Sequence, residues 1–335
     1  MGIRICTYNV EWFNRLFTSN TNNLKTDQKS VERLDAIAAA LKLVNADFVG
    51  IVEAPNTKIS GSESTTARLK TFATTYGLRT TSAIISYVSA GQQELAVLFD
   101  PSKVKVKRAK GGTKKVPAFD QEFLFDSDYD KIQEVYKFYR PPLEAKVAYG
   151  PTNKKKKFRL MLVHPKTKGI FSAMDKVHLE RESMRCRRKL LAECSWIRAR
   201  VDEWLQAGER VVVMGDINDG PGMDEYEWRF GRSAVEVIMG DLFDPDTVLR
   251  NYAGRPKWTD KGWNPASTRY TDRLTQDPIN VLIDHILVSK DIKAKVVNKK
   301  AQHIIWNPYE NKAAKPLKSQ LTLASDHFPV SLDIL

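Results

Sequence analysis

The hydrophobic and polar positions of the chain predict a protein built from both strands and helices. Short runs of consecutive apolar residues are typical of strands that are buried on both faces. Such runs lie at 3–9, 48–52, 95–99, 145–149, 158–163, 211–214, 281–288 and 328–334. A helix over 178–206, ended by Gly208, is indicated by apolar residues at alternating steps of four and three, namely Leu190, Cys194, Ile197, Val201 and Trp204.

Local signals place further elements. Ser30 is a candidate helix N-cap, because the residues after it put apolar side chains on one face at Val31, Leu34, Ile37, Ala38 and Leu41. Asp100-Pro101-Ser102 predicts a hairpin turn between strands at 95–99 and 104–106, and the lysines at 154–157 predict the tip of another hairpin. Strands and helices without regular alternation favour an α+β fold with two packed sheets and helices outside. Without a visible repeat or linker, we expect one domain over residues 1–335.

Composition and charge narrow the class of partner. The chain has 335 residues, of which 42% are hydrophobic, so it can bury a large core. Its formal net charge of +13 favours a polyanionic partner, although charge alone does not separate DNA from RNA or a membrane surface. The lysine-rich stretches at 103–115 and 154–157 are expected to be a charged strand edge and a solvated hairpin tip, with phosphate contacts as the alternative.

The cysteines and the N-terminal region bear on location. The three cysteines, Cys6, Cys186 and Cys194, are too scattered for a disulfide framework or a zinc site. No signal-type segment and no apolar run long enough to span a membrane is visible, so a cytoplasmic protein is the simplest expectation. A secreted protein whose leader has been removed is the alternative. No stretch of the sequence points to an obligate protein partner.

Polar residues suited to metal binding and proton transfer follow directly on the predicted strands. They are Asn9, Glu53, His164, Asp216, Asn218, Asp284, Asp326 and His327. Strand ends are rigid positions for aiming side chains. Oxygen ligands such as Glu53, Asp326 and Asn9 suit Mg²⁺, which binds through one or two carboxylates and keeps several waters. Together with histidines that titrate near neutral pH, such a cluster could hydrolyse a phosphodiester.

The motifs that contain these residues resemble those of the exonuclease/endonuclease/phosphatase superfamily. They are Thr7-Tyr8-Asn9-Val10, Val52-Glu53, Gly215-Asp216-Ile217-Asn218, Ile283-Asp284-His285-Ile286-Leu287 and Ser325-Asp326-His327-Phe328-Pro329-Val330. Each motif is weak alone, but they occur in the order of that superfamily and extend over residues 3–334. The resemblance implies a four-layer α/β sandwich, in which two mostly antiparallel or mixed sheets pack face to face.

The resemblance also implies roles for individual residues. Glu53 would hold the metal, with Asn9 and Asp326 beside it. The metal would be Mg²⁺ or Mn²⁺, with Ca²⁺ as an alternative and one or two ions in the active form. Asp216 would orient or deprotonate the attacking water, and Asn218 would hold that water or a phosphate oxygen. Asp284 would pair with His327, whose imidazolium would face the scissile phosphate.

Two features are similar to the pancreatic-type deoxyribonuclease branch of that superfamily. His164 resembles its general-acid histidine, although a histidine after an apolar strand is also commonly a structural core residue. Arg140, in Phe138-Tyr139-Arg140-Pro141-Pro142, resembles its phosphate-contacting arginine. The glutamate that supports the acid histidine in that branch would correspond to Gln93 or Glu94, and the sequence leaves the choice open.

A loop at 251–276 interleaves aromatic and basic residues. Trp258, Trp263, Arg269, Tyr270 and Arg273 could stack on bases and contact phosphates, or the aromatic residues could be local packing anchors. His178 and His303 have no motif around them and are expected at the surface. His285 should point away from Asp284 across its strand and is expected to be structural.

The leading hypothesis is therefore a Mg²⁺- or Mn²⁺-dependent phosphodiester hydrolase, an endonuclease whose partner is nucleic acid, DNA first and RNA second. One alternative keeps the site and changes the substrate, to a phosphomonoester or to a lipid or inositol phosphate. Another is a nucleic-acid-binding protein without catalytic activity.

Overall fold

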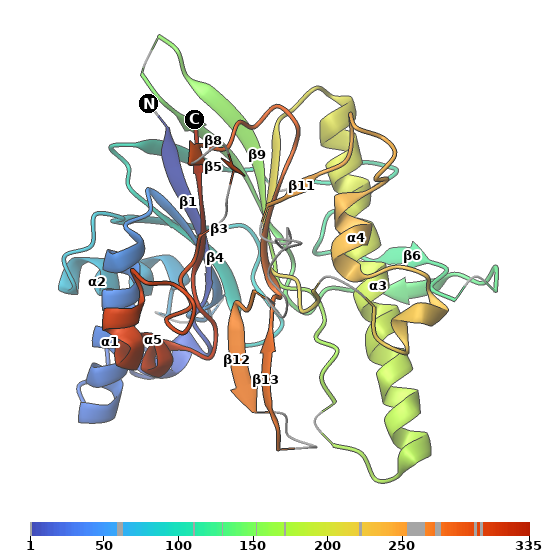
Figure 1. Cartoon of the computed structure of the whole chain (residues 1–335), viewed down its shortest axis with the longest axis horizontal. Coiled ribbons are helices and arrows are strands. Elements are labelled where there is room, and N and C mark those ends of the chain that lie inside the picture. Colours follow the sequence, from blue (N-terminus) through green and yellow to red (C-terminus); the bar gives the residue numbers. More distant parts are fainter. Residues whose placement is uncertain are drawn as a thin grey trace.

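Two six-stranded sheets form the centre of the molecule (Figure 1). The computed structural model describes residues 2–335 except 59–62, 110, 129, 152, 171, 221–222, 253–264, 272–275, 298–299 and 302–303. The first sheet has the strand order β17 (Ile304–Ile305), β18 (Val330–Ile334), β1 (Ile3–Asn9), β2 (Phe48–Ala54), β4 (Glu94–Phe99) and β3 (Ser82–Ile85). The second has the order β11 (Arg250–Asn251), β14 (Asp284–Val288), β10 (Val211–Asp216), β9 (Lys156–Val163), β8 (Leu143–Tyr149) and β5 (Val104–Arg108).

Most strand pairs in both sheets are antiparallel, but β1 and β2 run parallel, as do β9 and β10. Three small two-stranded sheets lie outside them: β6 (Phe123–Phe125) with β7 (Glu134–Tyr136), β12 (Thr268–Thr271) with β13 (Pro278–Val281), and β15 (Val296–Val297) with β16 (Lys300–Ala301). Both large sheets are thus mixed, as the sequence predicts.

Helices cover the outer face of each large sheet. The helices α1 (Gln28–Val44), α2 (Thr65–Thr75) and α5 (Lys318–Ala324) share a hydrophobic core with β1, β2 and β4. The helices α3 (Lys176–Gln206) and α4 (Ala234–Met239) share another with β9, β10 and β14. Short 3-10 helices are η1 (Phe13–Leu16), η2 (Glu227–Arg229) and η3 (Lys315–Leu317).

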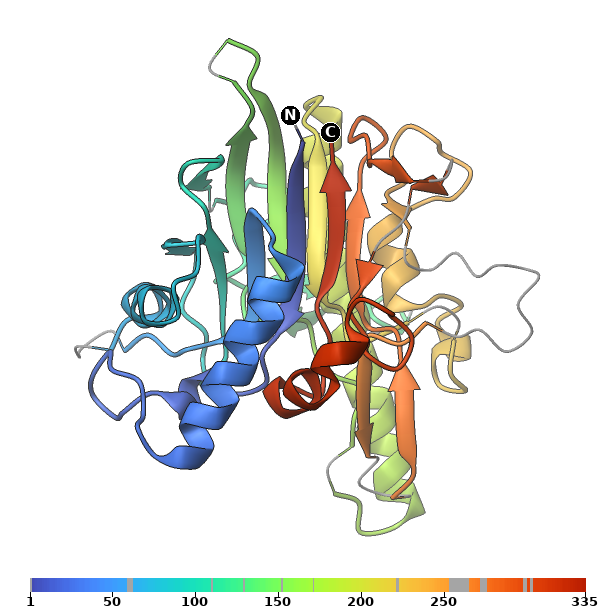
Figure 2. The same cartoon turned by 60° about the vertical axis from the view of Figure 1, so that its left-hand side comes forward.

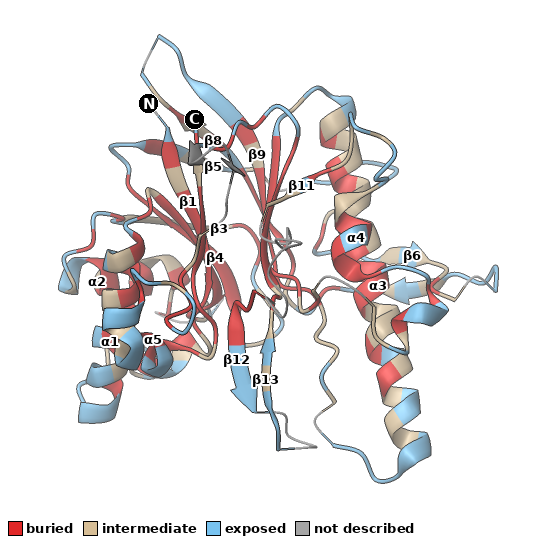
Figure 3. Cartoon of the chain, in the orientation of Figure 1, coloured by how far each residue is buried: buried red, intermediate tan, exposed pale blue. Residues whose placement is uncertain are grey.

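A third core lies between the sheets and contains side chains from both, such as Phe48 and Val97 from the first and Leu160 and Met214 from the second. All residues of β2 and β10 are buried, which explains why these strands consist of consecutive apolar residues rather than an alternating pattern (Figure 3). The four-layer arrangement with helices outside is confirmed. No helix in the described part of the chain has both the length and the apolar character that a membrane span requires.

The predicted hairpin at Asp100-Pro101-Ser102 is wrong. The strand before this turn, β4, pairs with β2 and β3 in the first sheet, and β5 after it pairs with β8 in the second. Asp100 stabilises the turn by accepting hydrogen bonds at Oδ1 from the backbone N–H and the hydroxyl of Ser102. The turn therefore carries the chain from one sheet to the other.

Two further boundaries differ from the prediction. Asp27, and not Ser30, caps α1, because its Oδ1 accepts the backbone N–H of Ser30. The predicted strand at 281–288 is divided between β13 and β14, so that only its second half belongs to the second sheet. The pairing of β8 with β9 and the helix near 178–206 are confirmed, and all three cysteines are buried and free.

Candidate active site

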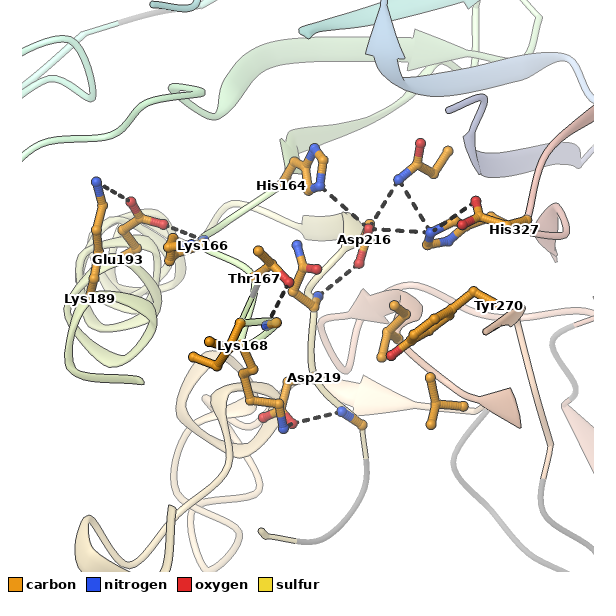
Figure 4. A pocket seen from close by; sticks show the side chains of 18 of the residues that line it. His164, Lys166, Thr167, Lys168, Lys189, Glu193, Asp216, Asp219, Tyr270 and His327 are labelled. Carbon is orange, nitrogen blue, oxygen red and sulfur yellow. Dashed lines mark hydrogen bonds and ion pairs between the residues drawn. The ribbon is translucent and has the colours of Figure 1, made fainter. Parts of the chain in front are cut away.

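The polar residues predicted from strand ends meet at one rim of the two sheets. Asn9, Glu53 and Asp216 lie at the carboxyl ends of β1, β2 and β10, and His164 directly follows β9. Because β14 and β18 run antiparallel to β10 and β1, their beginnings reach the same rim and bring Asp284 and His327 there. All of them except Asp284, which lies buried behind His327, line a cleft of about 1410 Å³, in which Figure 4 shows His164, Asp216 and His327.

Asp284 and His327 form a buried pair. Nδ1 of His327 donates to Oδ2 of Asp284 over 2.7 Å, and the hydroxyl of Ser267 donates to the same oxygen over 2.7 Å. Burial disfavours a charged imidazole, but the Asp284 and Asp216 carboxylates outweigh it and hold the pKa of His327 well above its ordinary value. His327 therefore carries a positive charge at the centre of the cleft.

Asp216 lies between the two histidines. Its Oδ2 accepts a hydrogen bond from Nδ2 of Asn9 over 3.1 Å and is 3.4 Å from Nε2 of His164 and 3.8 Å from Nε2 of His327. Its Oδ1 accepts the backbone N–H of Asn218. Burial raises the pKa of Asp216 to about 7 against the opposing effect of His327, so this carboxyl exchanges its proton near neutral pH.

His164 has an unusual environment for a group that transfers protons. Burial, together with the positive charges of Arg140 and His327, holds the pKa of His164 well below its ordinary value. Its Nδ1 is buried and has no hydrogen-bond partner within the described part of the chain. Gln93 and Glu94 have other partners. Oε1 of Gln93 accepts a hydrogen bond from Arg140, and Oε2 of the buried Glu94 accepts one from the backbone N–H of Ser89. Neither candidate for a supporting residue contacts the His164 ring in this structure.

Glu53 is aimed at the cleft by a bulge. The register between β2 and β4 shifts between Val52 and Ala54, which makes Glu53 the extra residue, and its φ is 57°. β-Bulges redirect side chains next to functional sites. The backbone N–H of Trp12 donates to Oε2 of Glu53 over 2.8 Å. Glu11 and Trp12 also have positive φ, so two further strained residues lie next to Glu53.

The cleft suits a hard divalent cation. Glu53, Asp326 and Glu11 all line it. Burial and the nearby Asp326 carboxylate raise the pKa of Glu11, although Arg33, whose guanidinium is 3.5 Å from Glu11, and His327 oppose this effect. Oδ1 of Asp326 is buried and has no hydrogen-bond partner among the described residues. One or two such carboxylates, completed by water, match the ligand preference of Mg²⁺.

A second set of possible metal ligands lies close together around Asp216. Single atoms of Asp216, Asp284 and His327 lie within 4.8 Å of one another. The hydrogen bond between His327 and Asp284 already occupies two of these groups. The carboxylates of Glu53 and Asp326, with Asn9 and Glu11 beside them, are therefore the better candidates for binding a cation.

Arg140 and Asn218 are joined through one carbonyl group. Nη2 of Arg140 and Nδ2 of Asn218 both donate to the backbone oxygen of Pro165, over 3.1 and 3.0 Å. Nε of Arg140 is buried without a partner within the described ranges. Burial lowers the pKa of the Arg140 guanidinium, and Glu53 and Glu193 oppose this effect. The guanidinium lies at the cleft, where an anionic ligand could neutralise it.

The other predicted residues lie as follows. Tyr270 is on β12 and lines the cleft, whereas the guanidinium of Arg269 stacks on Tyr309 at 4.2 Å from the ring centroid. Trp258, Trp263, Arg273 and His303 lie outside the described residues. His285 is fully buried, and its ring contacts Asn251 and the backbone oxygen of Asp219, consistent with a structural role. His178 is half-buried and its Nδ1 accepts the N–H of Met174.

Several cleft residues were not predicted from the sequence. Glu11 follows two positions after Asn9, beyond the strand, where an acidic residue was a usable signal. Glu193 is buried in α3, three residues after Leu190 and four before Ile197, and a charged residue in an apolar stripe was also a signal. Lys166, Lys168 and Lys189 line the cleft as well, in segments without a motif.

Comparison with known proteins supports the fold. No protein-family model matches the sequence, and no curated protein sequence is significantly similar to it. Three crystal structures of TDP2 from Caenorhabditis elegans superpose on the whole chain with a TM-score of 0.51. Sequence identity is 13% for the truncated protein, of which 98% is covered, and 12% and 13% for the others, of which 75% and 74% are covered.

TDP2 belongs to the exonuclease/endonuclease/phosphatase superfamily. The chain has the fold of this superfamily. At this low identity the likeness establishes the exonuclease/endonuclease/phosphatase fold, and the chemistry depends on the residues of the cleft.

Proposed function

We propose that the protein is a divalent-metal-dependent phosphodiesterase that cleaves internal phosphodiester bonds of nucleic acid, most readily of DNA. The observation that carries the proposal is the contact of Asp216 with Asn9, His164 and His327 at one rim, next to the carboxylates of Glu53 and Asp326. These residues come from distant parts of the sequence. Their convergence supplies a general base, carboxylates that could bind a metal cation, and a proton donor within one cleft.

The chemistry follows from the charges of these groups. A divalent cation, when bound, would supply Lewis-acid polarisation of the phosphate and offset the charge that develops on it. The His327 imidazolium and the Arg140 guanidinium bind and orient the non-bridging oxygens. Asp216 accepts the proton of the attacking water as the new bond to phosphorus forms. His164 gives its proton to the leaving oxygen as the old bond breaks.

The protonation of His164 requires the substrate. In the free protein, burial and the positive charges of Arg140 and His327 keep its pKa low. A phosphodiester placed against these two cations brings negative charge, which opposes the effect and raises the pKa of His164. Protonation of His164 is thereby coupled to substrate binding.

A polymeric anion is favoured over a small phosphoester by size and charge. The cleft of about 1410 Å³ exceeds the roughly 300–1000 Å³ of typical small-molecule pockets. The net charge is +13. Across β5, β8 and β9, Lys107 lies opposite Lys146, which lies opposite Arg159. Like charges directly opposite each other destabilise a sheet. Glu209 pairs with Arg159 over 3.0 Å, and a bound polyanion would relieve the remaining repulsion between the two lysines.

The test is a panel of substrates with Mg²⁺ and with a chelator. Supercoiled, linear and single-stranded DNA, RNA and small phosphoesters are incubated with the protein and with Asp216→Ala and His327→Ala. We expect Mg²⁺-dependent nicking of plasmid by the unmodified protein and none by either variant. Release of phosphate from small esters without nicking would replace the proposal by a phosphatase. Binding of DNA without any cleavage would leave a protein without catalytic activity.

A further inference from the structure

No described residue hydrogen-bonds to Nδ1 of the buried His164 ring. Its Nε2 is 3.4 Å from Oδ2 of Asp216, the proposed general base. The segment that follows it, residues 164–170, has no regular secondary structure. Since no described hydrogen bond orients the ring at Nδ1, its direction in the cleft also depends on what anchors the adjacent peptides.

The Pro165–Lys166 peptide group is such an anchor. Its carbonyl oxygen accepts hydrogen bonds from Arg140 and Asn218. Its N–H donates to Oε2 of Glu193 over 2.6 Å, a short bond of the charge-assisted kind (Figure 4). Three side chains thus fix a single peptide plane directly after His164. Arg140 and Asn218 come from the cleft, and Glu193 holds the other side from α3.

The position of Glu193 in α3 disfavours a charged side chain. It is buried in the apolar stripe of α3, where an aliphatic residue would be the ordinary choice. Burial raises the pKa of Glu193 to about 7, against the effects of Lys189, the Lys166 N–H and Arg140. The Lys189 ammonium is 3.7 Å from its Oε1, and side chains of both residues line the cleft (Figure 4).

We infer that Glu193 is a positioning residue for His164, which acts by fixing the Pro165–Lys166 peptide; this inference rests on the proposed function, in which His164 transfers a proton. Glu193 itself touches neither the reacting atoms nor the candidate metal ligands. It replaces, through the backbone, the direct side-chain support that neither Gln93 nor Glu94 gives to the ring.

The test compares Glu193→Leu, Glu193→Gln, His164→Ala and the double variant His164→Ala/Glu193→Leu. Leucine suits the apolar stripe, so Glu193→Leu should fold, while glutamine keeps an oxygen that accepts the Lys166 N–H. Initial rates with Mg²⁺ are measured on plasmid DNA and on a nitrophenyl phosphodiester, whose leaving group needs little protonation. Glu144→Ala is the matched control. Like Glu193, Glu144 is a buried carboxylate, but it lies on β8 of the second sheet and does not line the cleft.

We expect Glu193→Leu to lower kcat on DNA by about 10–100-fold, as loss of a supporting group commonly does. His164→Ala should lose less activity on the nitrophenyl ester than on DNA. Glu193→Leu should show the same ratio between its losses of kcat on the two substrates. Glu193→Gln should retain kcat within about threefold. Since the two residues act as one unit, adding Glu193→Leu to His164→Ala should change kcat by less than about threefold.

Other outcomes overturn the inference. If Glu193→Leu lowers kcat equally on both substrates, as Glu144→Ala would through general destabilisation, Glu193 has only a structural role. If its effect multiplies fully with that of His164→Ala, the residues act independently. If His164→Ala itself is as active as the unmodified protein, the proposed role of His164 fails first, and Glu193 has nothing to position.

Discussion

The substitution Asp284→Asn isolates the charge that supports His327. Asparagine has nearly the same shape as aspartate and can still accept the hydroxyl of Ser267, but it has no negative charge. The pair is buried, with Asp284 0% and His327 7% exposed, so solvent does not replace the lost interaction. We expect a folded protein in which the pKa of His327 falls and the imidazolium in the cleft is stabilised less strongly.

The magnitude follows from the type of bond. A hydrogen bond to a charged group contributes about 1.5–3 kcal/mol and a neutral one about 0.5–1.5 kcal/mol, so the substitution removes about 1–1.5 kcal/mol. Since one pKa unit corresponds to about 1.36 kcal/mol, the pKa of His327 should fall by about one unit. Loss of one preorganised group that stabilises charge on the reacting oxygens costs about 10²–10³ in kcat, so kcat/KM at neutral pH should fall by up to that factor.

The same pair predicts how stability depends on pH. The pKa of His327 is raised in the folded state, so its contribution to the free energy of unfolding is complete below about pH 6.5, the unfolded value. That contribution is lost as pH rises through the folded pKa. The difference in unfolding free energy between the unmodified protein and Asp284→Asn should therefore be largest in mild acid and shrink in alkali.

The measurements are an NMR titration of the imidazole resonances, denaturant unfolding at several pH values and initial rates on plasmid with Mg²⁺. Glu144→Gln, which neutralises a buried carboxylate outside the cleft, controls for a general effect. An unchanged His327 titration with full activity would show that Asp284 does not support the charge. A stability difference that grows with rising pH would contradict the direction of the pKa shift.

Three further predictions address the metal, the substrate and the fold. Glu53→Gln should weaken Mg²⁺ binding about 10–100-fold in calorimetry, and unchanged affinity would place the cation elsewhere. The logarithm of kcat/KM on plasmid should fall steeply and linearly with the logarithm of salt concentration, whereas a nitrophenyl phosphodiester should show little dependence. Gly215→Ala should prevent soluble expression or lower Tm strongly, because φ at Gly215 is 145° and a Cβ there would collide with the backbone oxygen of Val163. Normal stability of this variant would refute the local backbone conformation.

Sequence patterns predicted strands well where burial on both faces forces consecutive apolar residues, as in β2 and β10. They failed at Asp100, because the residues of a tight turn look the same whether the next strand pairs with its neighbour or joins another sheet. The partner of β5 is β8, nearly forty residues further along, and no local signal specifies it. Pairing between distant strands is decided by the packing of the whole core.

The site shows the same division. Asn9, Asp216 and His327 could be predicted because they belong to compact motifs next to strands. Glu193 acts on a peptide group twenty-seven residues away in sequence, so its role depends on where α3 packs against the segment after β9. The sequence does not distinguish Gln93 from Glu94, and only the folded structure shows that their oxygens accept hydrogen bonds from Arg140 and Ser89.

The position of β18 has a consequence for folding kinetics. This strand, near the C-terminal end, inserts between β17 and β1, so that Ile334 pairs with Ile3 and the two ends of the chain lie side by side (Figure 2). Contacts of such high sequence separation slow folding, while the entropy of closing a long loop grows only slowly with its length. A nascent chain that lacks residues 325–334 leaves β1 as an unpaired edge and has no His327. The catalytic rim can therefore be assembled only after the last strand has been synthesised, and until then the exposed edge of β1 is open to aggregation or to a chaperone.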